Sequence, residues 1–337
     1  MKPILSVGLC FGVAMLAGCG GSRPGLMPPD PATEPGSPPF ARLAASTLAR
    51  PDVRRSWMSP DAKKRDLLYV SDDTTYDVYV FSYPKGKLVG TLTGFSAPGG
   101  LCADSRGDVF VPNVFNSTIE EFAHGGTSPI ATLGDAAHSF PNSCDVNRTN
   151  GDLAVGNNAS GLDGEGRGAI AIYRGAAGTP SFHKAMYHPY SCGYDSAGNL
   201  FVDGEGAGFQ NFQFGEVPAS GKRYRRIKLN QAIALAGGVV AVGDTVAVGD
   251  VDGAAIYGFS ISGSSGTRVR TTRLPGTTVV WEFKVDGTRV IVPNYVLYKQ
   301  DSSDVLSYDY PRGGPALRAF AAGAVVDPVG AAVSRVQ

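Results

Sequence analysis

Three observations predict an all-β fold, specifically a six-bladed β-propeller with four-stranded blades. The first is a repeat that begins at Pro98, Pro141 and Pro189 and places four strand-like segments in roughly 45 residues, the period of a propeller blade. The second is composition, because 45 of the 337 residues are glycine and the apolar residues come in short runs without helical periodicity. The third is an incomplete copy of the repeat at each end of the chain.

Each clear copy has the same order of segments. Six residues after its Pro stands an Asp or Asn, followed by a glycine-containing turn and an apolar run such as DVFV (108–111) or NLFV (199–202). A polar loop, an aromatic-bearing strand, a second glycine turn and a last strand complete the copy. The first strand carries small residues (GGL, NSC, YSC), as suits an innermost strand that crowds toward the central axis.

The two ends of the chain are expected to complete the ring. Degenerate copies begin near Ala236 and Val279, the copy at Asp66 lacks its first strand, and the final DPVGAAVSRVQ looks like a solitary first strand. We expect 329–333 to pair beside 67–71, because a C-terminal strand in the N-terminal blade leaves no free sheet edge. The propeller domain is therefore expected to span residues 66–337.

The N-terminal residues predict export and lipid anchoring. A short apolar run follows Lys2, and residues 16–19 read LAGC, which resembles the bacterial lipobox. The resemblance implies a lipoprotein signal peptide over residues 1–18 and lipidation of Cys19. It also implies a lipid-anchored place in the bacterial cell envelope, at the outer membrane or facing the periplasm. An ordinary cleaved signal peptide with a chance Cys is the alternative.

Residues 19–60 are rich in Pro, which prevents both helix and sheet ladders, so they predict a disordered tether behind the lipidated Cys. Lys and Arg total 30, and so do Asp and Glu. The chain therefore has no global field that would attract nucleic acid, and no nucleic-acid partner is expected. No GxSxG, Walker, HExxH or Rossmann motif occurs, and no catalytic residue is predicted.

Three cysteines lie in the propeller region. Leu101, Cys144 and Cys192 share one repeat position, and Cys102 is shifted from it by one residue. A Cys144–Cys192 disulfide is conceivable in an exported protein. Equivalent positions of adjacent blades are, however, usually farther apart than the roughly 7 Å between Cα atoms that a disulfide tolerates. We therefore expect three buried, unpaired thiols.

A polar residue ends the second strand of every blade. These residues are Asp72, Asn113, Asn157, Asp203, Asp250 and Asn294. Side chains at one place in six blades would form a ring around one face of the propeller. Oxygen atoms in a ring suit a hard cation such as Ca²⁺, or the polar groups of a sugar or peptide. The alternative is that each side chain caps a turn.

Two acidic loops are expected on the same face as this ring. LDGEGRG and VDGEGAG place Glu165 and Glu205 between second and third strands, and loops on a rigid scaffold often carry binding sites. His138 and His188 each come shortly before the Pro of a repeat, which could place them at one mouth of the central channel. Solvated loop histidines are the alternative.

The repeat, with its Pro, Asp, Gly and apolar run, resembles the NHL-type propellers, which include extracytoplasmic bacterial lipoproteins. The resemblance covers Asp66 to the C-terminus and implies architecture rather than activity. The wider superfamily includes streptogramin-lyase-like enzymes and gluconolactonase-like enzymes, which hold a central divalent metal through Glu, Asn and Asp. Asn157, Asp203, Asp250 and Asn294 could supply the last two ligand types.

These features support two functions of different class. The first is a membrane-anchored extracytoplasmic module, without a cofactor, that binds a protein, peptide or glycan partner of the envelope. The alternative is a metal-dependent enzyme of lactonase or lyase type, with Ca²⁺ or another divalent cation at the mouth of the central channel. A purely structural role in the envelope is a third hypothesis.

Overall fold

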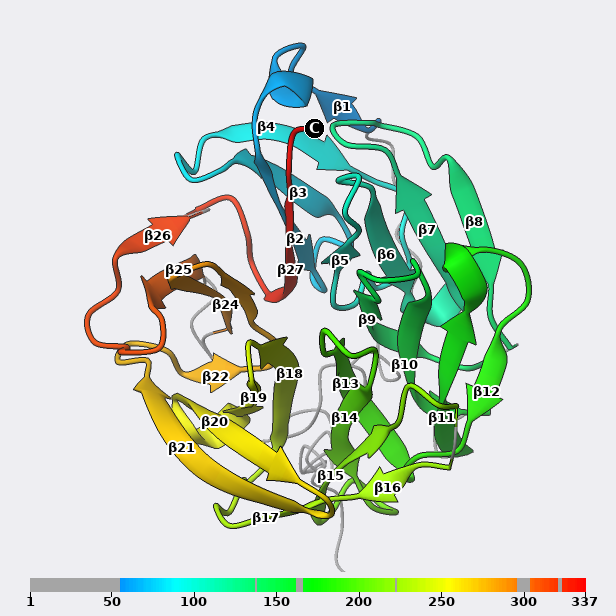
Figure 1. Ribbon diagram of the computed structural model, residues 1–337. Helices are drawn as coiled ribbons and strands as arrows, with labels where there is room; N and C mark the ends of the chain where they lie inside the picture. Colours follow the sequence, from blue (N-terminus) through cyan, green and yellow to red (C-terminus); the bar gives the residue numbers. More distant parts are fainter. Residues whose placement is uncertain (1–54, 137, 162–165, 222, 296–303, 321–322) are drawn as a thin grey trace, which may run out of the picture.

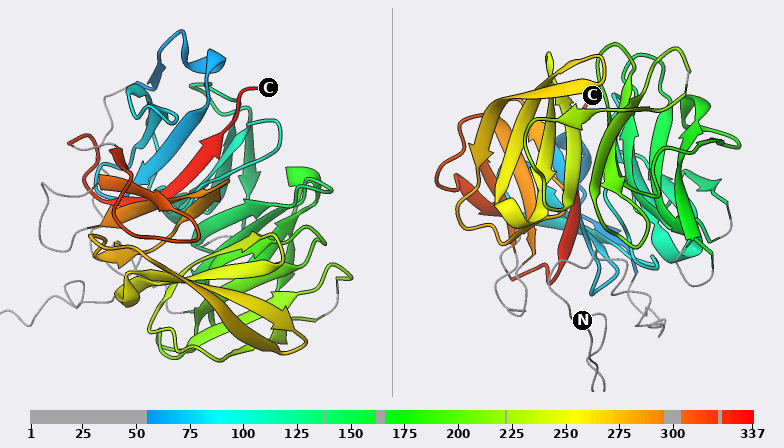
Figure 2. Two further views of the ribbon diagram at one scale, coloured as in Figure 1. Left: turned by 60° about the vertical axis from the view of Figure 1, so that its left-hand side comes forward. Right: turned by 90° about the horizontal axis from the view of Figure 1, so that it is seen from below.

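Six β-sheets stand around one central axis, so the predicted six-bladed propeller is confirmed (Figure 1). The structure is a computed structural model that describes residues 55–136, 138–161, 166–221, 223–295, 304–320 and 323–337. In the views of Figure 2 the sheets lie side by side, with their strands running across the thickness of the disc. Within the described ranges, no helix is long and apolar enough to cross a membrane.

Each sheet is one blade, and the first three blades have the following strands from the axis outward. Blade 1 contains β27 (Pro328–Ser334), β2 (Leu67–Asp72), β3 (Val78–Ser82), β4 (Leu88–Leu92) and β1 (Trp57–Met58). Blade 2 contains β5 (Cys102–Ala103), β6 (Val109–Asn113), β7 (Thr118–Phe122) and β8 (Ala131–Gly134). Blade 3 contains β9 (Pro141–Val146), β10 (Leu153–Ser160), β11 (Gly166–Tyr173) and β12 (Ser181–His183).

The other three blades follow in chain order. Blade 4 contains β13 (His188–Tyr194), β14 (Leu200–Glu205), β15 (Phe212–Val217) and β16 (Arg225–Arg226). Blade 5 contains β18 (Ala236–Val242), β19 (Thr245–Asp250), β20 (Ala255–Ser262), β21 (Ser265–Arg273) and β17 (Lys228–Leu229). Blade 6 contains β22 (Val279–Val280), β23 (Lys284–Asp286), β24 (Arg289–Tyr295), β25 (Asp304–Asp309) and β26 (Arg318–Phe320), with β22 and β23 both paired to β24.

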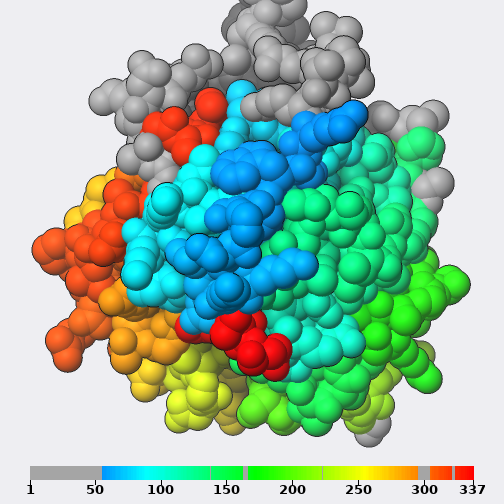
Figure 3. Space-filling view, turned by 90° about the horizontal axis from the view of Figure 1, so that it is seen from above, coloured from blue at the N-terminus to red at the C-terminus, as the bar shows by residue number. Residues whose placement is uncertain are grey.

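The ring closes in blade 1 as the sequence predicts. β27 pairs antiparallel with β2, from Leu67 opposite Ser334 to Asp72 opposite Pro328. The Asp72 carboxylate accepts hydrogen bonds from the backbone N–H groups of Val326 at 2.6 Å and Asp327 at 3.1 Å. Figure 3 shows the last residues of the chain (red) in contact with the first described segment (blue).

The propeller begins earlier than predicted. Trp57 and Met58, assigned above to the tether, pair with Thr91 and Gly90 on the outer edge of β4, and Ala62 is fully buried. The Pro-rich stretch stops before Trp57, so these residues can donate and accept ladder hydrogen bonds that cover a sheet edge. The predicted signal peptide, Cys19 and the tether before residue 55 lie outside the described residues.

The core lies between adjacent blades. One cluster joins Phe110 of blade 2 with Val155 and Tyr173 of blade 3, and all three side chains are fully buried. Tyr173 and Tyr308 stand on third strands, β11 and β25, where the repeat predicted aromatic residues. Because every blade packs on two neighbours, each interface depends on the ring staying closed.

The expected set of three free thiols is wrong. Cys102 and Cys144 form a disulfide between blades 2 and 3, with their Cα atoms 5.5 Å apart, and only Cys192 is free among the described cysteines. Side chains on a strand alternate between its two faces. Cys144 therefore faces the preceding blade, and Cys102, offset by one residue, faces the following blade. The position equivalent to Cys102 in blade 3 is Asp145, so Cys192 has no cysteine opposite it.

Candidate functional site at the central axis

The predicted ring residues lie near one mouth of the central channel, but they stand on the second strands, one strand farther from the axis than the innermost strands. Asp72 pairs with Pro328, Asn113 with Pro98 and Asn157 with Pro141, so each stands opposite the start of an innermost strand. Asp250 opposite Ala236 and Asn294 opposite Val280 repeat the arrangement. All five are almost fully buried.

Most of these side chains hold the segment that leads into the innermost strand of their own blade. Backbone N–H groups donate from Ser96 to Asn113 at 2.7 Å, from Ala234 to Asp250 at 3.2 Å and from Thr278 to Asn294 at 2.9 Å. Asp72 also accepts from Thr74 and Thr75, in its own turn. These two bonds of Asp72 are turn capping of the kind weighed above. Asn113 and Asn294 also donate from Nδ2 to the carboxylates of Glu120 at 2.9 Å and Asp304 at 3.1 Å.

Asn157 and Asp203 differ from the other four. Asn157 donates from Nδ2 to the Asp135 carboxylate at 3.1 Å, and its Oδ1 has no hydrogen-bond partner in the described structure. Asp203 stands one residue before the ring position, which Gly204 occupies in blade 4. Since strand side chains alternate, this offset turns Asp203 to the opposite face of β14, where it accepts from the Ser191 N–H at 2.9 Å.

Of the two predicted loop carboxylates, the structure describes only Glu205. Glu205 is the last residue of β14 rather than a loop residue, and its side chain is only 6% exposed. Burial raises its pKa to about 7. Glu165 lies outside the described residues. A ligand-binding role for the ring and for these two residues stays a prediction.

The residues that do reach the axis come from the innermost strands. One residue of each blade lies two positions after the residue that pairs with the ring position, and these six residues share one axial position: Gly330, Gly100, Ser143, Ser191, Gly238 and Glu282. Five of the six are Gly or Ser, which confirms the prediction that the innermost strands carry small residues near the central axis. The sixth, Glu282, places a carboxylate on the axis. Sequence reasoning missed it, although WEF in the fifth copy stands where other copies read NSC or YSC.

Glu282 is packed against backbone. A Cβ added at Gly100 would lie 2.0 Å from Glu282 Oε1, so this approach requires glycine. The Gly100 N–H donates to the Asn142 carbonyl at 2.7 Å, which holds the two blades in place around the carboxylate. Glu282 is 5% exposed, and its Oε2 has no hydrogen-bond partner in the described structure. An unsatisfied buried acceptor of this kind is rare and costs stability.

The electrostatics of the axis favour a protonated carboxyl group. Burial raises the pKa of Glu282 to about 8, and the carboxylates of Asp203 and Asp145 add to the rise. Burial also raises the pKa of Asp203 to about 7, partly offset by backbone N–H groups of Ser191 and Gly238. Lys284, the cation that acts on both Glu282 and Asp145, lowers their pKa values but does not outweigh burial.

A small pocket at the axial mouth exposes this carboxyl group to ligands. It has a volume of about 20 Å³, and Glu282, Asn142 and Tyr190 supply its polar side chains together with Asp73. The Tyr190 ring lies 6.0 Å from the Trp281 ring, and both side chains are buried. About 10–15 Å³ holds one water-sized group, so the enclosed part fits a single amide, ammonium or hydroxyl head.

Neither His138 nor His188 lines the axial pocket. His188 is buried, its Nδ1 lies 3.0 Å from the Asn158 carbonyl oxygen, and its ring stacks on Phe209. His138 has a positive φ of 58° in the segment before blade 3. Among the described residues, no three His, Cys, Asp or Glu side chains form a group that could hold a metal ion. The metal-dependent alternative stays a prediction without a ligand set in this part of the chain.

Replacement of Glu282 by Gln should change how stability depends on pH. A carboxyl whose pKa is raised on folding is destabilising once ionised, so the wild type should lose stability as pH rises from about 4.5 to about 8. We expect the advantage of Glu282→Gln in unfolding free energy to grow over this range, by up to about 1.4 kcal/mol per pH unit. Urea unfolding at several pH values measures this difference, and parallel profiles would contradict it.

Comparisons with known proteins support the fold only. No family model and no curated protein sequence matches the chain. A structure from a nidogen–laminin complex has a TM-score of 0.64 at 13% identity, covering 81% of this chain and 99% of that chain. A protein of unknown function from Bacteroides caccae has a TM-score of 0.59 at 10% identity, covering 80% and 99%. The chain is therefore a six-bladed β-propeller, a fold that serves many unrelated functions.

Proposed function

We propose that this protein is a membrane-anchored, extracytoplasmic binding module of NHL type that recognises a protein, peptide or glycan partner at the axial mouth. The observation that carries the proposal is Glu282, a buried carboxyl group with an unpartnered oxygen that lines a pocket between small residues. A rigid scaffold with one such polar group suits recognition of a ligand group that donates hydrogen bonds.

Two further observations support parts of the proposal. The Cys102–Cys144 disulfide suits an oxidising compartment outside the cytoplasm. The anchor itself rests on LAGC and Cys19, and the outer membrane is the proposed site. One solved structure with this fold comes from a complex between two proteins, nidogen and laminin, which favours a protein or peptide partner over a glycan.

Binding to peptide and glycan arrays tests the proposal. Ligands captured by the full chain would be measured by calorimetry against Glu282→Gln and Glu282→Ala. We expect affinity to fall by at least about tenfold in Glu282→Ala, because the donor on the ligand loses its acceptor. Glu282→Gln keeps an oxygen acceptor and should lose less.

A control variant should leave this binding unchanged. Arg106 is exposed and pairs with Asp104 in the turn between β5 and β6, at the opposite end of the blade from the axial mouth. Arg106→Ala should therefore bind every array ligand as the wild type does. Array ligands whose affinity is the same for Glu282→Ala and the wild type would rule out the axial mouth as the binding site.

A further inference from the structure

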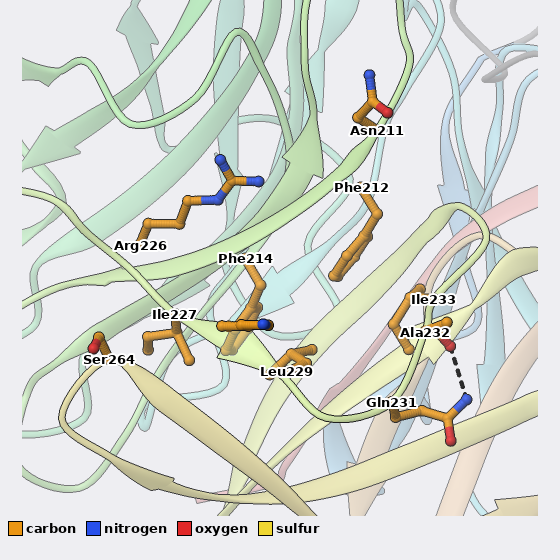
Figure 4. Close-up of a pocket in the computed structure, with 11 residues that line it drawn as sticks. Asn211, Phe212, Phe214, Arg226, Ile227, Leu229, Gln231, Ala232, Ile233 and Ser264 are labelled. Carbon is orange, nitrogen blue, oxygen red and sulfur yellow. Dashed lines mark hydrogen bonds between the residues drawn. The ribbon is translucent and has the colours of Figure 1, made fainter.

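A second concave surface lies on the outside of the propeller between blades 4 and 5, far from the axis. We call it the outer groove (Figure 4). It has a volume of about 760 Å³, within the range of ordinary ligand sites. Its apolar lining consists of Phe212, Phe214, Ile227, Leu229 and Ile233. Figure 4 shows these side chains gathered around one space.

The outer groove forms because β16, the fourth strand of blade 4, is only two residues long. β16 pairs with β15 only through Arg225 and Arg226, opposite Glu216 and Gly215. The chain then leaves blade 4, and β17 pairs in parallel with β21 of blade 5. Every other pairing between the described strands of these two blades is antiparallel.

This departure leaves the outer edge of β15 uncovered at its first residue, Phe212. The Ile227 N–H donates to the Phe214 carbonyl at 2.8 Å, so the backbone groups of Phe214 point toward the outer edge. Backbone groups two residues apart on a strand point the same way, so the N–H and C=O of Phe212 do as well. No described strand pairs with this edge at Phe212. An open edge is a template for another strand.

The rim of the outer groove is basic. Arg226 and Lys228 line it, both are exposed, and neither has an ion-pair partner among the described residues. Arg225 beside them pairs with Glu216 at 2.6 Å. Exposed Arg268 and Arg270 continue the basic surface on β21. Since Lys and Arg equal Asp and Glu over the whole chain, this concentration is a local excess of positive charge.

We propose that the outer groove binds an acidic peptide segment of a partner protein in extended conformation, as an added strand on β15. The peptide would pair with Phe212 where β16 ends. Its alternate side chains would enter the apolar lining, and its carboxylates would meet Arg226 and Lys228. This surface is separate from the axial mouth, so the proposal does not depend on Glu282.

The probes are peptides of about seven residues that alternate Glu with Val or Phe, and a matched series that replaces Glu by Lys. Fluorescence anisotropy with the full chain measures their binding. We expect the acidic series to bind more tightly, with an affinity that weakens as salt is added. Equal binding of the Lys series, or no binding by the acidic series, overturns the proposal.

N-methylation distinguishes strand addition from charge attraction alone. Methyl groups on every second backbone nitrogen block one edge of a peptide strand, and methyl groups on the other nitrogens block the opposite edge. Because only one edge can face β15, we expect one methylated peptide to lose at least about tenfold in affinity and the other to bind as the parent does. Equal affinity of both would exclude an added strand.

Charge variants locate the site. Arg226→Glu with Lys228→Glu should weaken the acidic peptide by about tenfold or more, and both residues are exposed, so folding should be unaffected. Arg312→Glu is the matched control, since Arg312 is exposed on blade 6 and pairs with Asp309. A similar loss in Arg312→Glu would indicate non-specific attraction. If the double variant also lost binding to anionic phospholipid vesicles, by as much as it lost binding to the acidic peptide, the groove would instead be a site for a lipid surface.

Discussion

Deletion of residues 328–337 should abolish cooperative folding of the propeller. The deletion removes β27, whose side chains at Ala331 and Ala332 are 1% exposed, and it leaves β2 as an open edge on the axis. The loss of one inner strand opens every blade interface next to it. We expect a cost above about 5 kcal/mol, the lower end of the total stability of a domain. Urea unfolding and gel filtration would show a non-cooperative transition and aggregation.

A shorter deletion is the control for this experiment. Removal of residues 335–337 takes away the exposed ion pairs of Arg335 with Asp66 and Asp286 but keeps β27. Exposed ion pairs contribute little, so the cost should stay near or below about 1 kcal/mol. Cooperative unfolding of the chain that ends at residue 327 would contradict ring closure by β27.

Adding the missing strand back as a separate peptide makes the test stricter. A peptide of residues 326–337 should restore cooperative unfolding to the truncated chain. The same peptide with Gly330→Val should not, because a Cβ at Gly330 would lie 2.6 Å from the Gly100 Cα. Comparison of the two peptides shows whether folding needs a strand that fits against Gly100 at the axis, or only an apolar strand in that place.

Loss of the Cys102–Cys144 disulfide should have the second largest effect. The bond links residues 42 positions apart in adjacent blades, and closing a loop of this length restricts the unfolded chain. We expect Cys102→Ala with Cys144→Ala to lower the unfolding free energy by about 2–4 kcal/mol. Urea unfolding of the wild type with reductant should show a similar loss.

Cys192→Ala is the matched control for the disulfide. Cys192 is buried and unpaired, so its replacement removes one sulfur atom and leaves a small cavity. The variant should keep its sensitivity to reductant, because the Cys102–Cys144 bond remains. A wild type whose unfolding midpoint is unchanged by reductant would show that this disulfide does not contribute to stability.

Parts of this arrangement could be predicted from the repeat because they depend on local pattern. The spacing of Pro, Asp and Gly marks the four strands of a blade, and DPVGAAVSRVQ can only complete the blade that lacks a first strand. The small residues GGL, NSC and YSC marked the axis for the same reason. Polar residues such as Asn113 and Asn294 were found at second-strand ends, but their hydrogen bonds to the entering segments were not foreseen.

The sequence by itself determined the number of blades, their closure by β27 and the crowded axis. Only the tertiary structure decided which side chains meet across blades. A shift of one residue reverses the side of a strand on which a side chain lies, and this turns Asp203 out of the ring and brings Cys102 to Cys144. The position of Glu282 on the axis and the open edge at Phe212 likewise depend on neighbouring blades. Contacts between blades join residues far apart in the chain, so no local sequence pattern predicts them.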